Sequence, residues 1–154
     1  LQEAGASGNF TRGENLHLTL AFLGETDRTL EISQAMAAVR SDPFSLSISG
    51  LGRFKRRGGD LWWAGLAASK PLLAVQEQLS DHLRAAGFPL ERRPFTAHIT
   101  LGREVRIAPE RSREMLSMPL SLPPTEVTKL TLMRSHRVNG VLTYTPINRI
   151  ELTP

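Results

Sequence analysis

The same four-residue pattern occurs twice in the chain, and this repeat restricts the fold more than any other feature. His17-Leu18-Thr19-Leu20 lies near the start and His98-Ile99-Thr100-Leu101 lies in the second half. Alternation of polar and apolar residues is typical of a half-buried β-strand. We therefore expect each histidine to share a face with its threonine, while the aliphatic residues face a core. A histidine is followed by apolar-Thr-apolar only about once in a hundred times, so the repeat indicates a function.

Length and composition limit the possible classes of protein. The chain has 154 residues, enough for one domain with a real core. It has no cysteine, which excludes disulfides, thiolate metal sites and cysteine nucleophiles. No apolar run has the length of a membrane span, so we expect a cytoplasmic protein without membrane contact. The net charge of +4 favours a polyanionic partner such as RNA, although solvated arginines explain it equally well.

Hydrophobic periodicity and turn residues give the order of the expected elements. Strands are expected near 16–23, 44–48, 61–67, 96–103, 127–134 and 141–144, with an extended piece at 147–152. Helices are expected near 27–39, 70–86 and 109–118. Thr26 or Asp27 should cap the first helix, Ser69 should cap the second, and Gly87 should close the second.

This order predicts the fold class. Helices interspersed with hairpins indicate an α+β fold with mainly antiparallel sheets. Each motif strand is followed by a helical segment, which indicates two similar lobes that face each other. Asn139-Gly140 is a strong turn dipeptide and should join the last two long strands as a hairpin.

Two histidines on one face of a sheet can supply the general acid and the general base that cleavage of a phosphodiester requires. One neutral imidazole can take a proton from water while the other, protonated, gives one to a leaving oxygen. Histidine suits both roles because its unperturbed pKa is about 6.5. The threonine hydroxyls can donate hydrogen bonds to phosphate oxygens. Without a neighbouring carboxylate or cysteine the two histidines are an incomplete set of zinc ligands, although residues distant in the sequence could complete it. We expect no metal and no other cofactor.

The residues around both motifs resemble those of a known family. Residues 14–24 (ENLHLTLAFLG) and 98–103 (HITLGR) resemble the paired motifs of the 2H phosphoesterases. Within that superfamily the chain resembles the RNA 2′,3′-cyclic phosphodiesterases, also called 2′-5′ RNA ligases. Residues 50–54 with 61–65 are similar to the middle strands of the family, and residues 141–144 to its closing hairpin. The resemblance extends from the first residue almost to the last.

The resemblance implies a particular architecture. Residues 1–154 would form a single bilobal domain, with two pseudo-symmetric lobes of antiparallel sheet backed by helices on either side of a central cleft. The family begins with a further strand and a full helix. We therefore expect a domain truncated at its N-terminus relative to the family, whose first lobe lacks that strand and most of that helix.

The resemblance also implies an activity and roles for residues. The family opens 2′,3′-cyclic phosphate ends of RNA to a 2′-phosphate without a metal. His17 would be the general acid that protonates the leaving 3′-oxygen, and His98 the general base that activates water. Thr19 and Thr100 would hold the phosphate, and so would Arg103.

Simple alternation places Arg103 on the core face, with Ile99 and Leu101. A bulge at Gly102 would turn Arg103 to the cleft, whereas the alternative is a strand-end arginine in solvent.

Several other residues are candidates for RNA binding. Phe54 and Arg56 lie in the basic stretch 53–57, which could equally be a solvated hairpin tip. Arg92 and Phe95 precede the second motif; Arg92 could border the cleft and Phe95 could stack on a base or pack in the core. Trp62 and Trp63 point to opposite faces of their strand, so at most one can face the cleft. We assign no role to His82 or His136.

Three functions stay open at this point. The leading hypothesis is hydrolysis of cyclic phosphate ends, on RNA or on small cyclic nucleotides. The second is reversible 2′-5′ RNA ligation by the same chemistry. The third is a non-catalytic module that binds RNA ends or nucleotides. No obligate protein partner is expected, and a monomer is the default.

Overall fold

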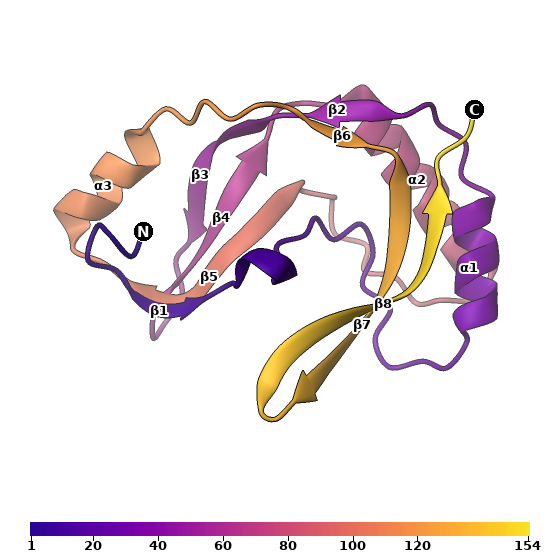
Figure 1. Ribbon diagram of the computed structural model, residues 1–154, viewed down its shortest axis with the longest axis horizontal. Coiled ribbons are helices and arrows are strands. Elements are labelled where there is room, and N and C mark those ends of the chain that lie inside the picture. Colours follow the sequence, from indigo (N-terminus) through magenta and orange to yellow (C-terminus); the bar gives the residue numbers. More distant parts are fainter. The chain divides into compact units, whose positions relative to one another are not determined.

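The computed structural model describes all residues, 1–154, as three α-helices, one short 3₁₀-helix and eight strands (Figure 1). Every strand pair is antiparallel, which confirms the predicted α+β class. None of the helices is long and apolar enough to cross a membrane. The chain divides into two compact units: unit 1 comprises residues 1–19, 47–68 and 96–124, and unit 2 comprises residues 20–46, 69–95 and 125–154.

Unit 1 is built on a four-stranded sheet with the order β1-β5-β4-β3 (Figure 1). The strands are β1 (Ser7–Phe10), β3 (Ile48–Phe54), β4 (Asp60–Leu66) and β5 (His98–Arg106), accompanied by the 3₁₀-helix η1 (Gly13–Asn15) and the helix α3 (Pro109–Ser117). β3 and β4 form a hairpin around the basic loop, and they contain residues 50–54 and 61–65, which resemble the middle strands of the family. Asp60 holds this hairpin together, since its Oδ2 accepts a hydrogen bond from Arg53 Nη1 at 2.8 Å.

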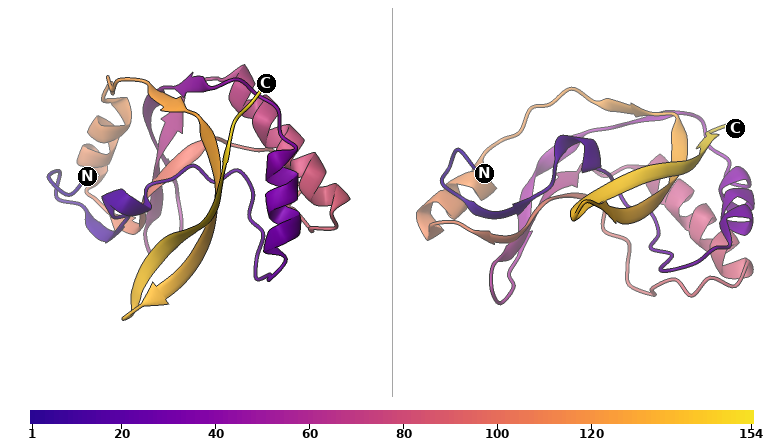
Figure 2. Two further views of the ribbon diagram at one scale, coloured as in Figure 1. Left: turned by 45° about the vertical axis from the view of Figure 1, so that its right-hand side comes forward. Right: turned by 60° about the horizontal axis from the view of Figure 1, so that its bottom comes forward.

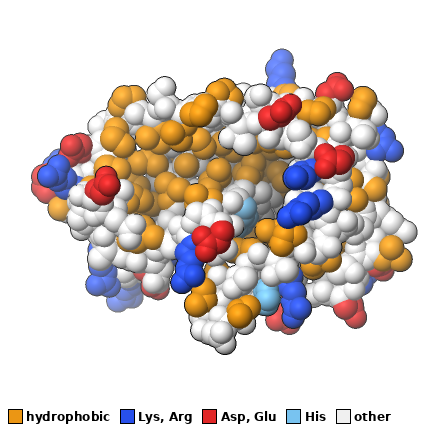
Figure 3. Space-filling view, viewed as in Figure 1, with side chains coloured by type: hydrophobic (Ala, Val, Ile, Leu, Met, Phe, Trp, Pro, Cys, Tyr) orange, Lys and Arg blue, Asp and Glu red, His pale blue; other side chains and the backbone are white.

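One face of this sheet is covered in part by α3. Trp62 of β4 is 0% exposed, and Ser112 of α3 is completely buried. Unit 1 also has an open groove. Its lining residues come from the N-terminus, β1 and the residue after it, β3, β5, α3 and the segment after α3: Leu1, Gln2, Phe10, Thr11, Leu51, Leu101, Met115, Met118 and Leu120. A broad field of apolar side chains is visible in Figure 3, viewed as in Figure 1.

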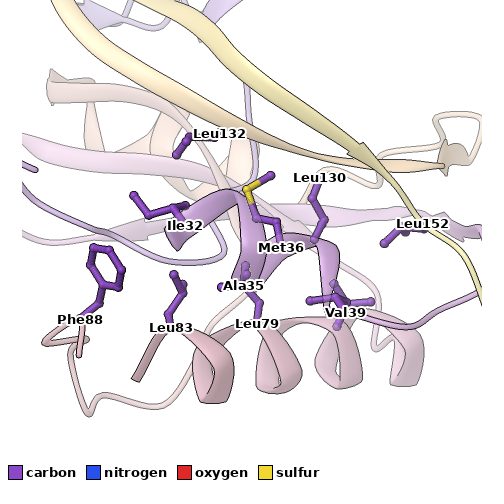
Figure 4. Close-up of a cluster of buried hydrophobic side chains, with 11 residues drawn as sticks. Ile32, Ala35, Met36, Val39, Leu79, Leu83, Phe88, Leu130, Leu132 and Leu152 are labelled. Carbon is purple, nitrogen blue, oxygen red and sulfur yellow. The ribbon is translucent and has the colours of Figure 1, made fainter. Parts of the chain in front are cut away.

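Unit 2 packs two helices and two small sheets around one apolar cluster (Figure 4). Its elements are α1 (Thr29–Ala37), α2 (Lys70–Ala85), the β2–β6 pair (Phe44–Leu46 with Thr125–Val127) and the β7–β8 pair (Lys129–Val138 with Val141–Glu151). The cluster takes residues from both helices, from β7 and from the segments that follow α1, α2 and β8: Ile32, Ala35, Met36, Val39, Val75, Leu79, Leu83, Phe88, Leu130, Leu132 and Leu152.

The ends of α2 follow from local chemistry. Ser69 is the N-cap, and its side-chain oxygen accepts a hydrogen bond from the Leu72 N–H at 3.2 Å. At the other end Gly87 has a φ of +87°, which allows the Phe88 N–H to donate to the Leu83 carbonyl at 3.0 Å. Both predicted helix signals are confirmed.

The β7–β8 pair is a long two-stranded ribbon that turns at Asn139-Gly140 (Figure 2). Both turn residues have positive φ, +50° and +77°, as a tight hairpin of this type requires. The predicted hairpin is confirmed, and residues 147–151 of the extended piece expected at 147–152 belong to β8.

Three expectations about element boundaries were wrong. The strand expected at 44–48 divides at Ser47, because Phe44–Leu46 pairs with β6 whereas Ile48 already pairs with β4. The first helix begins at Thr29 and has no side-chain cap at its N-cap residue, Arg28. The Thr26 hydroxyl instead accepts a hydrogen bond from the N–H of Arg28, the N-cap residue itself, at 3.1 Å. The strand expected at 16–23 is reduced to one bridge at Leu18, because no other strand pairs with this segment.

The core of unit 2 can be tested with two leucines of one helix. Leu83 is 1% exposed and Leu73 is 52% exposed, and both lie on α2. We expect Leu83→Ala to lower the free energy of unfolding by about 2–5 kcal/mol, because it leaves a cavity. Leu73→Ala should change it by less than about 0.5 kcal/mol. Urea unfolding measures both, and equal effects would contradict the described core.

Candidate active site

The first motif lies against the second because the N-terminal segment runs along the edge of β5. Ser7 pairs with Arg106, Phe10 pairs with Gly102, and the Thr11 N–H donates to the Leu101 carbonyl at 2.9 Å. The chain then turns away from the edge of β5 through η1 and meets this edge again at Leu18, which forms an antiparallel bridge with Ile99. The first motif therefore lies directly beside the second.

The Leu18–Ile99 bridge sets the positions of all four motif side chains. In an antiparallel pair, the residues on either side of a bridged pair face one another, so His17 lies across from Thr100 and Thr19 across from His98. All four lie on the face opposite to the two aliphatic residues. Directly opposite Cβ atoms are about 4.5–5.5 Å apart and diagonal neighbours about 7–8 Å. The two imidazoles are diagonal neighbours, a separation that leaves room for a small tetrahedral group.

His17, Leu18 and Thr19 of the first motif and the whole of the second motif belong to unit 1, whereas Leu20 already belongs to unit 2. The bridge ties the first motif to the sheet that already contains the second.

The two histidines are oriented in the same way. His17 Nδ1 lies 2.7 Å from the Asn15 carbonyl oxygen, and His98 Nδ1 lies 2.7 Å from the Thr96 carbonyl oxygen. A carbonyl oxygen can only accept, so Nδ1 of each ring carries the proton and donates it. Nε2 is thereby the atom at which each ring exchanges a proton with a ligand. Both residues are half-buried, so each ring combines a fixed orientation with access from outside.

An aromatic cluster surrounds His98. Trp63 of β4 pairs with Thr100 and shares its face of the sheet. The Trp63 ring lies 6.2 Å from the His98 ring at an interplanar angle of 63°, and the Phe54 ring lies 6.2 Å from it at 89°. Phe54 and Trp63 are themselves 5.5 Å apart. Edge contacts of this kind are favourable and restrict the rotation of the imidazole. Phe54 is 41% exposed, so part of its ring remains available to a ligand.

The position of Trp63 depends on a glycine of the neighbouring strand. Gly52 is its cross-strand partner in β3, and a methyl group added at Gly52 would overlap the Trp63 indole. The indole also lies over Gly65, where an added Cβ would be 3.1 Å from Trp63 Cζ3. Sequence reasoning missed both Gly52 and the role of Trp63. The hairpin register around the basic loop could have paired them.

The structure places Arg103 by means of a bulge. Trp63 pairs with Thr100 and Trp62 pairs with Gly102, so Leu101 is the extra residue of β5. Trp62 and Trp63 point to opposite faces, hence Thr100 and Gly102 do so as well. Arg103, which follows Gly102, thus lies on the face of Thr100. The register shift occurs at Leu101 rather than at the expected Gly102, and Arg103 is exposed.

The remaining candidate residues are spread over both units. Arg56 lies in the exposed loop after Phe54, where its N–H donates to Asp60 Oδ1 at 3.2 Å. Arg92 and Phe95 belong to the segment of unit 2 between α2 and β5, so their part in binding stays a prediction. No group of three or more histidine, aspartate or glutamate side chains is arranged to hold a metal ion.

The contact between Trp63 and His98 gives a prediction for NMR spectra of the histidine rings. Gly52→Ala should displace the indole and shift the His98 ring signals, because ring currents from Trp63 and Phe54 act on them. Trp63→Leu, which adds no bulk, should shift the same signals. Gly13→Ala is the control, since its methyl group would meet no atom within 4 Å. Unchanged His98 signals in a folded Gly52→Ala protein would contradict the contact.

Comparisons with known proteins agree with this geometry. The family model of the 2′-5′ RNA ligase superfamily matches residues 2–139. An RNA 2′,3′-cyclic phosphodiesterase of Geobacillus stearothermophilus is 34% identical over 129 residues, which are 80% of this chain and 41% of that protein. The chain thus spans less than half the length of that relative. An enzyme of the same name from Thermotoga maritima is 35% identical over 82% of this chain and 69% of its own.

Solved structures show the same fold. The crystal structure of Escherichia coli LigT without ligand has a TM-score of 0.75 and 30% identity, and the match covers 99% of this chain and 83% of LigT. LigT in complex with 3′-AMP has a TM-score of 0.69 and 29% identity over 96% of this chain and 81% of LigT. Sequence, fold and the two motifs lead to one conclusion: the chain belongs to the 2′-5′ RNA ligase superfamily.

Proposed function

We propose that this protein hydrolyses the 2′,3′-cyclic phosphate ends of RNA to 2′-phosphate ends by general acid–base catalysis. The observation that carries the proposal is the matched pair of histidines. Each donates Nδ1–H to the carbonyl two residues before it, and the Leu18–Ile99 bridge places both on one face. Two relatives with the name RNA 2′,3′-cyclic phosphodiesterase support the choice of substrate.

The reaction needs two proton transfers, and the two Nε2 atoms supply them. Water attacks phosphorus as its proton passes to Nε2 of His98, the general base. The bond between phosphorus and the 3′-oxygen breaks as Nε2 of His17, the general acid, protonates that oxygen. The product carries a 2′-phosphate and a free 3′-hydroxyl. Each ring ends in the protonation state in which the other began, and exchange with solvent restores both.

Three further residues are proposed to bind the phosphate. Thr19 and Thr100 lie across from the two histidines, where their hydroxyls can donate to the non-bridging oxygens. The register of β5 supports Arg103 as a third ligand, since it shares the face of Thr100. A guanidinium suits the charge that grows on these oxygens in the transition state. Phe54, beside His98, is proposed to stack on the terminal base, with Arg56, Arg92 and Phe95 as further RNA contacts.

Ligation is the second candidate function, favoured by the superfamily to which the chain belongs. A 5′-hydroxyl in place of water would attack the same phosphorus, and loss of the 3′-oxygen would leave a 2′-5′ phosphodiester. The same acid and base serve both reactions. We place the activity in the cytoplasm and propose that the protein needs no metal and no protein partner for it.

Removal of either imidazole should lower turnover strongly without unfolding the protein. We expect His17→Ala and His98→Ala each to lower kcat by about 10²–10⁴-fold. His82→Ala, on α2 of unit 2, is the matched control and should keep the original rate. Steady-state kinetics and circular dichroism check both points. A variant with a rate near that of the original protein would remove its histidine from the mechanism.

Product analysis tests the mechanism and its regiochemistry. A short RNA with a 2′,3′-cyclic phosphate end, incubated with the protein and excess chelator, should yield only a 2′-phosphate. Phosphorus NMR distinguishes this product from a 3′-phosphate. A 3′-phosphate would reverse the leaving oxygen, and loss of turnover in chelator would refute the metal-free mechanism. Binding without turnover would favour the non-catalytic module.

A further inference from the structure

The β7–β8 ribbon continues well beyond the core of unit 2. Leu130 and Leu132 are buried in that core, and they are the last residues of β7 to contribute to it. The two strands run on together past this point to the turn (Figure 2). From Met133 to Ile147 every side chain is exposed except those of His136, Thr143 and Tyr144, which are half-buried. This outer part of the ribbon, residues 133–147, contains no aspartate or glutamate.

One face of the outer ribbon gathers hydrogen-bond donors. Alternation along β7 places Arg134 and His136 on the face that Leu130 and Leu132 occupy further back. Thr145 lies directly across from Arg134, and His136 Nε2 lies 2.7 Å from the Thr145 hydroxyl oxygen. A guanidinium, a hydroxyl and an imidazole therefore stand side by side on this face.

Arg134 has no partner within the chain. It is exposed, and its guanidinium forms no hydrogen bond or ion pair with another residue. By contrast, Arg137 on the other face donates to the Gly140 carbonyl at 2.8 Å. A planar guanidinium with unused donors matches the oxygens of a phosphate, and the adjacent hydroxyl and imidazole can add further donors.

The open shape of the ribbon favours a polymer over a small ligand. Small molecules bind in concave sites that bury most of their surface, whereas this face is exposed except at the half-buried His136 and Thr143. Val138 and Val141, next along the same face, are also exposed and offer apolar surface to unpaired bases. Single-stranded nucleic acid combines phosphates with such bases along one chain.

We propose that this face of the ribbon, Arg134, His136 and Thr145, binds the sugar-phosphate backbone of RNA away from the reacting end. The proposal rests on the proposed function, which supplies an RNA end as substrate. It makes RNA strands, rather than small cyclic nucleotides, the preferred substrate class.

The test compares the reaction of the protein, residues 1–154, with two substrates. One is a mononucleoside 2′,3′-cyclic phosphate, and the other is a single-stranded RNA of about 16 nucleotides with the same end, the upper range of single-strand sites. Arg134→Ala should raise KM for the RNA about tenfold and reduce the slope of log affinity against log salt by about one. Neither kcat nor the reaction of the mononucleotide should change.

Two variants complete the design. Arg134→Lys keeps the positive charge but lacks the planar guanidinium. It should therefore have the salt slope of the original protein but only part of its affinity for RNA. Arg149→Ala removes an exposed arginine from the same ribbon, on the other face, and should leave the RNA reaction as it was. Equal losses for Arg134→Ala and Arg149→Ala would overturn the proposal, because they would reveal a general charge effect. So would an unchanged KM for RNA.

Direct binding separates this proposal from the catalytic one. Fluorescence anisotropy with a 2′-phosphorylated RNA of the same length measures affinity without turnover. If neither substrate reacts but Arg134→Ala still weakens RNA binding about tenfold, the proposed function fails and the ribbon site stands. If both substrates react but the variant binds RNA as tightly as the original protein, the ribbon site fails and the proposed function stands.

Discussion

The single bridge between Leu18 and Ile99 is the contact on which the site depends. It brings the two motifs into antiparallel register and thereby fixes which hydroxyl faces which imidazole. The bridge lies at the edge of β5 next to the part that pairs with β1, and η1 separates β1 from the bridge along the chain. A shift of one residue at the bridge would turn His17 and Thr19 to the opposite face.

Each histidine then needs only local contacts to be oriented. The carbonyl groups of Asn15 and Thr96 belong to the same chain segments as the rings they hold, two residues earlier. The arrangement is therefore repeated with the motif. It fixes the tautomer of each ring by a backbone atom, which a change of side chain cannot remove. The surroundings differ, since the structure places aromatic rings against His98.

Glycine contributes to this difference through the space it leaves. Gly52 and Gly65 flank the Trp63 indole, which fills the room that side chains at those positions would take. The ring then covers the sheet beside Thr100 and meets the edge of the imidazole. On the other face of β4, Trp62 is completely buried. The two adjacent tryptophans thus lie on opposite faces of the sheet, as strand alternation requires: Trp62 is buried in unit 1, and Trp63 lies beside the motifs.

Local sequence determined much of this protein. Hydrophobic periodicity predicted the helix α2, with Ser69 as its cap and Gly87 at its end, and Asn139-Gly140 predicted the β7–β8 hairpin. These features depend on residues within one turn of each other. The repeated motif identified the candidate histidines. Only the tertiary structure decided that both motifs join one sheet, that the bulge falls at Leu101, and that Trp63 rests on Gly52. Strand partners come from distant parts of the chain, so register is fixed by pairing between segments and not by the pattern within either one.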